Sequence, residues 1–94
     1  MRQNPQVVKW QLVFTRDAQK DALKLTSAGL KPKAELLLKI LESDPWQTPP
    51  RYEKLVGDLA RAYSRRINIQ HRLVDQVFKE QRIVKVLRLW SHYE

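Results

Sequence analysis

The sequence of residues 62–90 is AYSRRINIQHRLVDQVFKEQRIVKVLRLW, and it predicts three strands in succession. They are expected at Ala62–Ile69, His71–Phe78 and Arg82–Trp90, where β-branched, aromatic and other large apolar residues are frequent. A tight turn near Glu80–Gln81 joins the last two strands into an antiparallel hairpin, although the usual Asn-Gly turn signal is missing. Three adjacent strands in so short a chain predict a sheet as its main layer.

A strand and a helix are expected before this region. Val7–Phe14 is rich in β-branched and aromatic residues, which favours a first strand. Thr15 suits the N-cap of a helix, because its hydroxyl accepts a hydrogen bond from a backbone N–H of the first turn. Apolar residues keep helical spacing up to Ala28, and Gly29 stands where a C-terminal cap is expected.

A second, amphipathic helix is expected from Pro32 to about Asp44. Apolar residues recur at i, i+3, i+4 and i+7 from Ala34, and charged residues fill the other face. Pro45 ends the helix, and the chain from Pro45 to Gly57 is expected to form a long loop. The resulting order is β-α-α-β-β-β, an α+β fold in which an antiparallel sheet packs against a helical hairpin.

Length and composition predict one small domain, residues 1–94. The sequence has no cysteine, which excludes disulfides, thiolate metal sites and cysteine nucleophiles. Two histidines alone make a poor zinc site, so we expect neither a metal nor a cofactor. No apolar run exceeds three residues and the N-terminus lacks the apolar segment of a signal peptide, so we expect no membrane segment and a cytoplasmic location.

A net charge of +8 points to an anionic partner, such as nucleic acid, a membrane surface or an acidic protein. Positive charge is concentrated between Leu59 and Val74, a segment without any acidic residue. Its basic residues are Arg61, Arg65, Arg66, His71 and Arg72. From charge alone, a strand face that is simply exposed to solvent is as good an interpretation as a binding surface.

The residue types needed for metal-free cleavage of RNA are also present. A base must take the proton of a ribose 2′-hydroxyl, an acid must protonate the leaving 5′-oxygen, and cations must stabilise the phosphate. Glu53, the two histidines and the arginines supply a carboxylate, imidazoles and guanidiniums. Most basic domains contain the same residue types, so this inventory is not specific by itself.

The order of three short motifs is more specific. Ser64-Arg65-Arg66-Ile67, His71-Arg72-Leu73-Val74 and Ser91-His92-Tyr93 closely resemble the Txe/YoeB branch of the RelE superfamily of toxins. Glu53 precedes them where that family has its catalytic glutamate. The resemblance implies a small, metal-independent endoribonuclease that cuts messenger RNA in the ribosomal A site and is silenced by a cognate antitoxin.

The resemblance also implies roles for individual residues. Glu53 would be the general base and His92 the general acid. Arg72 would stabilise the phosphate, and Tyr93 would orient the substrate or stack on it. The expected RNA-binding residues are Arg65, Arg66, Lys54 and Arg61. A base and an acid in different protonation states predict a bell-shaped dependence of rate on pH.

Structural alternatives stay open for several of these residues. Neighbouring residues on a strand point to opposite faces, so only one of Arg65 and Arg66 can face RNA there. Arg66 is favoured, and in the alternative Arg65 is structural or binds the antitoxin. Glu53 as a surface ion-pair partner and His71 as a structural residue are the corresponding alternatives. Val56 stands where the family often has an RNA-contacting lysine, which puts codon preference and rate in question.

The register of the last hairpin decides whether the acid can reach the phosphate site. A regular two-residue turn at residues 80 and 81 sets Arg72 opposite Leu89. Arg72 then shares a face with Tyr93, while His92 points to the other face. We therefore predict an odd-length loop, a β-bulge or a departure of His92 from strand geometry that brings His92 round to Arg72.

The expected partners are the ribosome with its messenger RNA and a YefM/Axe-like antitoxin. An acidic, partly disordered segment of the antitoxin is expected to wrap the basic surface. No membrane partner is expected, and a homodimer and a heterocomplex with antitoxin are both open. Three competing functions stay open: a non-catalytic RNA-binding module, a ParE-like toxin that poisons gyrase and cuts no RNA, and a degenerate toxin kept for its antitoxin complex.

Overall fold

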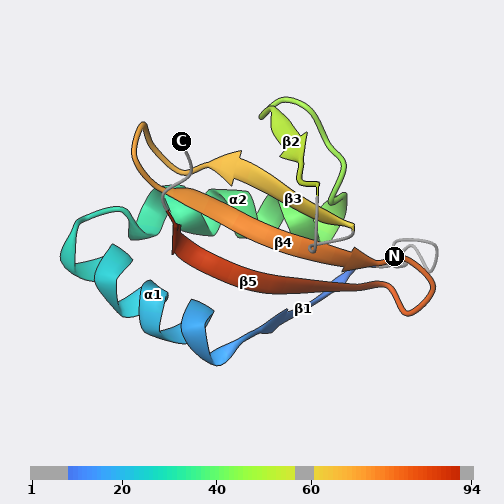
Figure 1. The fold of residues 1–94 in the computed structure, drawn as a ribbon, viewed down its shortest axis with the longest axis horizontal. Helices are drawn as coiled ribbons and strands as arrows, with labels where there is room; N and C mark the ends of the chain where they lie inside the picture. Colours follow the sequence, from blue (N-terminus) through green and yellow to red (C-terminus); the bar gives the residue numbers. More distant parts are fainter. Residues whose placement is uncertain (1–8, 57–60, 92–94) are drawn as a thin grey trace, which may run out of the picture.

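The chain forms a twisted sheet with its helices packed on one face (Figure 1). The computed structural model describes residues 9–56 and 61–91. The elements are β1 (Gln11–Phe14), α1 (Arg16–Ser27), α2 (Lys31–Ser43), β2 (Tyr52–Lys54), β3 (Ala62–Arg66), β4 (Arg72–Phe78) and β5 (Ile83–Ser91). The predicted α+β class and the predicted order of elements are confirmed, with β2 as an additional short strand inside the predicted loop.

The sheet is mixed rather than antiparallel. Within the described residues it has five strands in the order β1-β5-β4-β3-β2. β1 lies parallel to β5, with Gln11 opposite Ile83, and the other neighbours are antiparallel. The prediction of an antiparallel sheet was wrong because the direction of this edge strand depends on pairing between segments at opposite ends of the chain.

The first strand is shorter than the predicted Val7–Phe14. β1 begins at Gln11, and residues 7 and 8 lie outside the described ranges. The backbone N–H of Trp10 donates instead to the carbonyl of Glu42 in α2, at 2.8 Å. Trp10 is therefore tied to the helical layer, which the β-propensity of residues 7–14 does not reveal.

Both helices begin and end close to the predicted positions. The hydroxyl of Thr15 accepts a hydrogen bond from the N–H of Ala18 at 3.0 Å, as expected of an N-cap. Gly29 has a φ of 75°, the left-handed conformation typical of a residue that ends a helix. Asp44 caps α2 in an extended conformation, directly before Pro45.

The core lies between the helices and the sheet. In Figure 1, α2 runs behind β3 and β4, while α1 contacts mainly β5. Most of the large buried apolar residues are leucines of the helices and valines and leucines of β4 and β5: Leu25, Leu37, Leu41, Leu73, Val77, Val84, Val86 and Leu89. No helix in the described ranges is both long and apolar enough to cross a membrane.

Candidate active site

A basic hollow lies on the face of the sheet that is turned away from the helices. Side chains alternate along a strand, so Ser64 of β3 lies on the face opposite Tyr63, which packs against the core. The hollow has a volume of about 230 Å³ and is lined by Pro50, Arg51, Glu53, Ser64, Arg66 and Arg72. Three arginines and one glutamate make its lining positive, which suits an anion such as a phosphate group.

Glu53 and Arg72 form the centre of this basic hollow. Pairing of β2 with β3 places Glu53 opposite Ser64, and pairing of β3 with β4 places Arg66 opposite Arg72. Nη1 of Arg72 donates to Oε1 of Glu53 at 3.0 Å and to Oγ of Ser64 at 3.2 Å. The side chain of Arg72 is 13% exposed and that of Glu53 49% exposed. A partly buried guanidinium thus orients a carboxylate that solvent, or a substrate hydroxyl, can reach.

The structure brings together only part of the predicted RNA-binding set. Arg66 is exposed and lines the basic hollow. Lys54 is exposed but pairs with Tyr63, so it lies on the face of the sheet opposite Glu53. Arg61 lines a different hollow, together with Trp46 and Tyr63. Contacts of Lys54 and Arg61 with RNA stay a prediction, and any such contact lies away from Glu53.

Two irregularities in the last hairpin shift its register near the basic hollow. The regular pairing next to the turn holds from Phe78 and Ile83 up to Asp75 and Val86. Beyond that pair, β5 has one extra residue before the pair of Val74 with Arg88 and one more before the next pair. Arg72 therefore lies opposite Ser91 instead of Leu89. The pairing therefore has β-bulges, one of the three predicted irregularities, while the approach of His92 to Arg72 stays a prediction. His92 and Tyr93 lie outside the described residues.

Arg65 is not a surface residue, and its assignment to RNA binding was wrong. It is 1% exposed and lies on the face of β3 that is turned towards the core. Its guanidinium donates to three backbone carbonyls: Nη1 to Gln47 at 2.9 Å and to Pro50 at 2.6 Å, and Nη2 to Pro45 at 2.9 Å. Burial lowers the pKa of Arg65, and the negative charge of Asp75 opposes this shift. The structural alternative for this arginine is the correct one.

The arrangement of these residues agrees with a comparison of the sequence with protein families. Residues 14–93 match the family model described as YoeB-like toxin of bacterial type II toxin-antitoxin system. The chain belongs to this toxin family. The resemblance found in the motifs around Glu53, Arg72 and His92 is thereby confirmed, and the match extends through both helices. A comparison with curated protein sequences finds no significant match.

Solved structures of YoeB proteins have the same fold as this YoeB-like toxin. A YoeB/ParE toxin from Agrobacterium tumefaciens is 28% identical, with a TM-score of 0.79 over 88% of this chain and 99% of that chain. A YoeB dimer from Staphylococcus aureus is 29% identical, with a TM-score of 0.76 over 89% and 98%. A heterotetrameric YoeB-YefM toxin-antitoxin complex from the same organism is 30% identical, with a TM-score of 0.70 over 89% and 98%.

Asp21 of α1 supports the bulged part of β5 and was missed in the sequence. Its Oδ2 accepts hydrogen bonds from Nε of Arg88 at 2.8 Å and from the N–H groups of Leu89 and Trp90 at 3.0 and 3.2 Å. Burial alone would raise the pKa of Asp21, but these hydrogen bonds and the charge of Arg88 lower it. Asp21 lies three residues after the buried Ala18, and an acid on the apolar face of a helix is the signal that could have revealed it.

Arg51 lines the basic hollow but carries no clear sequence signal. Arg51 lies 3.9 Å from Glu53 and is highly exposed. His71 is buried and stacks on Trp90, with ring centroids 3.8 Å apart, which agrees with the structural role considered for it. The described residues contain no group of three or more His, Cys, Asp or Glu side chains that could hold a metal ion.

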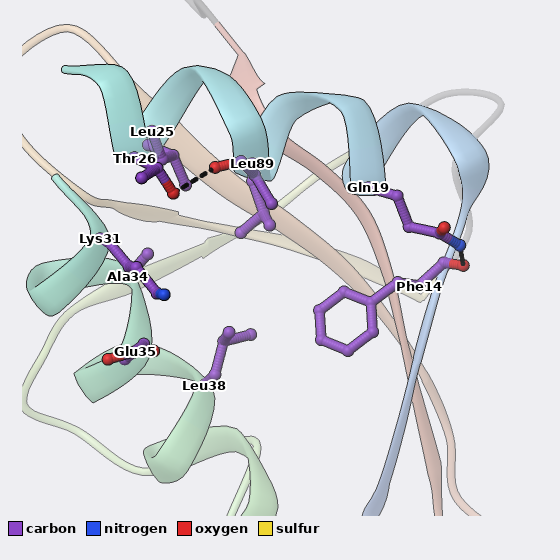
Figure 2. A pocket seen from close by; sticks show the side chains of 10 residues that line it. Phe14, Gln19, Leu25, Thr26, Lys31, Ala34, Glu35, Leu38 and Leu89 are labelled. Atoms are coloured by element: carbon purple, nitrogen blue, oxygen red, sulfur yellow. Dashed lines mark hydrogen bonds between the residues drawn. The ribbon is translucent and has the colours of Figure 1, made fainter. Parts of the chain in front are cut away.

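An apolar groove between α1 and α2 differs in character from the basic hollow. Figure 2 shows Leu25 of α1, Ala34 and Leu38 of α2, and Phe14 of β1 around it. Its volume is about 350 Å³, and Leu89 of β5 also contributes to its lining. Because aliphatic and aromatic side chains dominate this lining, the groove suits apolar side chains rather than acid–base chemistry.

Proposed function

We propose that this YoeB-like toxin is a metal-independent, ribosome-dependent endoribonuclease that cleaves messenger RNA in the A site. The observation that carries the proposal is the contact between Glu53 and Arg72 inside a basic hollow. It places a proton acceptor next to a cation that can bind the phosphate under attack. Residues 1–94 act as a single toxin domain in the cytoplasm, where the ribosomes are.

In this reaction Glu53 takes the proton of the 2′-hydroxyl, whose oxygen then attacks the adjacent phosphorus. Arg72, together with Arg66, stabilises the negative charge that builds up on the phosphate oxygens. His92 protonates the leaving 5′-oxygen and Tyr93 orients the substrate. Each positioned acid or base contributes about 10²–10⁴-fold to the rate. The ribosome supplies the alignment of the RNA strand that so small a hollow cannot supply by itself.

The proposed partner in the resting cell is an antitoxin whose acidic segment covers the basic hollow. Carboxylates on such a segment would pair with the exposed Arg51 and Arg66 and exclude the RNA phosphates. Antitoxin and RNA are therefore expected to compete. Simultaneous binding of both at the hollow would contradict this part of the proposal.

The test is single-turnover cleavage on programmed ribosomes together with mapping of RNA ends after induction in bacteria. Glu53→Gln removes the proton acceptor and keeps the shape, and it is expected to slow cleavage by about 10²–10⁴-fold while ribosome binding persists. Glu35→Gln removes another exposed carboxylate, on α2, and serves as the matched control, with cleavage as in the wild type. EDTA is expected to leave cleavage unchanged on ribosomes that stay intact.

Two results would contradict the proposal. Growth arrest without new cuts in messenger RNA would favour a ParE-like target or a non-catalytic RNA-binding module. Full cleavage by Glu53→Gln would remove Glu53 from the role of general base.

A further inference from the structure

Arg65 joins the core of the sheet to the loop that precedes β2. Its three carbonyl partners belong to Pro45, Gln47 and Pro50, so one guanidinium spans most of the segment between α2 and β2. The guanidinium is planar and presents its N–H donors in a rigid fork, which is suited to holding several acceptors in one arrangement. The buried guanidinium thus holds the loop through the backbone carbonyls of the loop.

The same guanidinium also contacts the first residue of β2. Cζ of Arg65 lies 4.8 Å from the ring centroid of Tyr52, and the two residues are opposite each other in the pairing of β2 with β3. The Tyr52 ring in turn meets the Tyr63 ring edge-on, with centroids 5.3 Å apart. Arg65 and Tyr63 therefore hold Tyr52 on the core side of the sheet.

Glu53 follows Tyr52 directly and points to the other face, into the basic hollow. β2 contains only three residues, Tyr52–Lys54, and it lies at the edge of the sheet. A strand so short, with a neighbour on one side only, is held weakly by its own backbone hydrogen bonds. The place of the Glu53 carboxylate therefore depends on what holds the loop and Tyr52.

We propose that Arg65 is a positioning residue, which acts through the loop and Tyr52 to hold Glu53 against Arg72. This inference rests on the proposed function, in which Glu53 is the general base. It assigns the two arginines of the Ser64-Arg65-Arg66-Ile67 motif to opposite faces and different tasks: Arg66 faces the RNA, and Arg65 places the base. A displacement of about 1 Å at a reacting group is enough to cost about 10²-fold in rate.

The experiment is a double-mutant cycle between Arg65→Met and Glu53→Gln, measured as single-turnover cleavage on saturating ribosomes. Arg65→Met alone is expected to slow cleavage by about 10²-fold, and in the Glu53→Gln background it is expected to add no further loss. The second measurement is hydrogen exchange of the amide of Leu55, the residue after β2, which donates to the carbonyl of Ala62. Its exchange is expected to accelerate in Arg65→Met, while amides of β4 stay protected.

Leu25→Ala, a core change in α1 rather than in this loop, is the control for loss of stability. It is expected to cleave at the wild-type rate at a temperature where it is folded. Should Arg65→Met fail to fold, Arg65→Lys decides by the same measurements, since it keeps the charge but cannot bridge the three carbonyls.

Wild-type cleavage by a folded Arg65 variant, multiplicative loss in the double mutant, or unchanged exchange at Leu55 would overturn the inference. A wild-type protein that does not cleave RNA would refute the proposed function instead. In that case the exchange of Leu55 still decides whether Arg65 holds β2.

Discussion

The buried carboxyl group of Asp75 is expected to make the stability of this toxin depend on pH. Asp75 lies on β4 and is 0% exposed, and neither of its oxygens has a hydrogen-bond partner within the described residues. Burial raises its pKa from 3.8 to about 7, and the positive charge of Arg65 only partly opposes this shift. Ionisation of this buried carboxyl group near pH 7 therefore lowers the free energy of unfolding.

The size and sign of the effect follow from the difference between the folded and unfolded states. A shift from 3.8 to about 7 is roughly three pKa units, or about 4 kcal/mol at ~1.4 kcal/mol per unit. Between pH 4 and pH 7 the folded state retains a proton that the unfolded state has lost, so the free energy of unfolding falls as pH rises through this window. Asp75→Asn keeps the side chain neutral at every pH and removes this dependence.

Urea unfolding of Asp75→Asn and wild type, followed by circular dichroism at several pH values, measures the effect. The free energy of unfolding of the variant minus that of the wild type is expected to rise by about 3 kcal/mol from pH 5 to pH 8, because other titrating groups cancel in the difference. Leu25→Ala, which removes no titratable group, is the control and keeps a constant difference. A difference for Asp75→Asn that stays constant with pH would refute the reasoning.

Two further predictions concern residues that hold the scaffold. Asp21→Ala leaves the N–H groups of Leu89 and Trp90 without their acceptor and is expected to destabilise the fold by about 2–4 kcal/mol; a loss under about 0.5 kcal/mol in urea unfolding would contradict the support assigned to Asp21. Gly29 has a φ of 75°, and a Cβ added there by Gly29→Ala meets no other atom within 4 Å. Only backbone strain of about 1 kcal/mol is therefore expected to destabilise this variant, and an unchanged thermal midpoint would contradict the prediction.

Elements whose signals are local could be predicted from the sequence. The Thr15 cap, the apolar stripe of α2 and the left-handed Gly29 depend on residues within a few positions of one another. The same holds for the strands in the second half of the chain. The motifs around Arg66 and Arg72 identified the family, because residue order is itself a property of the sequence. That two adjacent arginines point to opposite faces also followed from the period of a strand.

Which of these arginines faces the core was decided by the tertiary structure, since facing depends on where the helices pack. Pairing between strands likewise decided that β2 is a strand and that β1 is parallel to β5. It also decided that Arg72 lies opposite Ser91. The contact between Glu53 and Arg72 joins residues 19 positions apart through two strand pairings. The sequence by itself determined the elements and the types of group available for chemistry. Only the packed sheet could set the carboxylate beside the guanidinium, because the register between strands is fixed by burial and by long-range backbone hydrogen bonds rather than by neighbours along the chain.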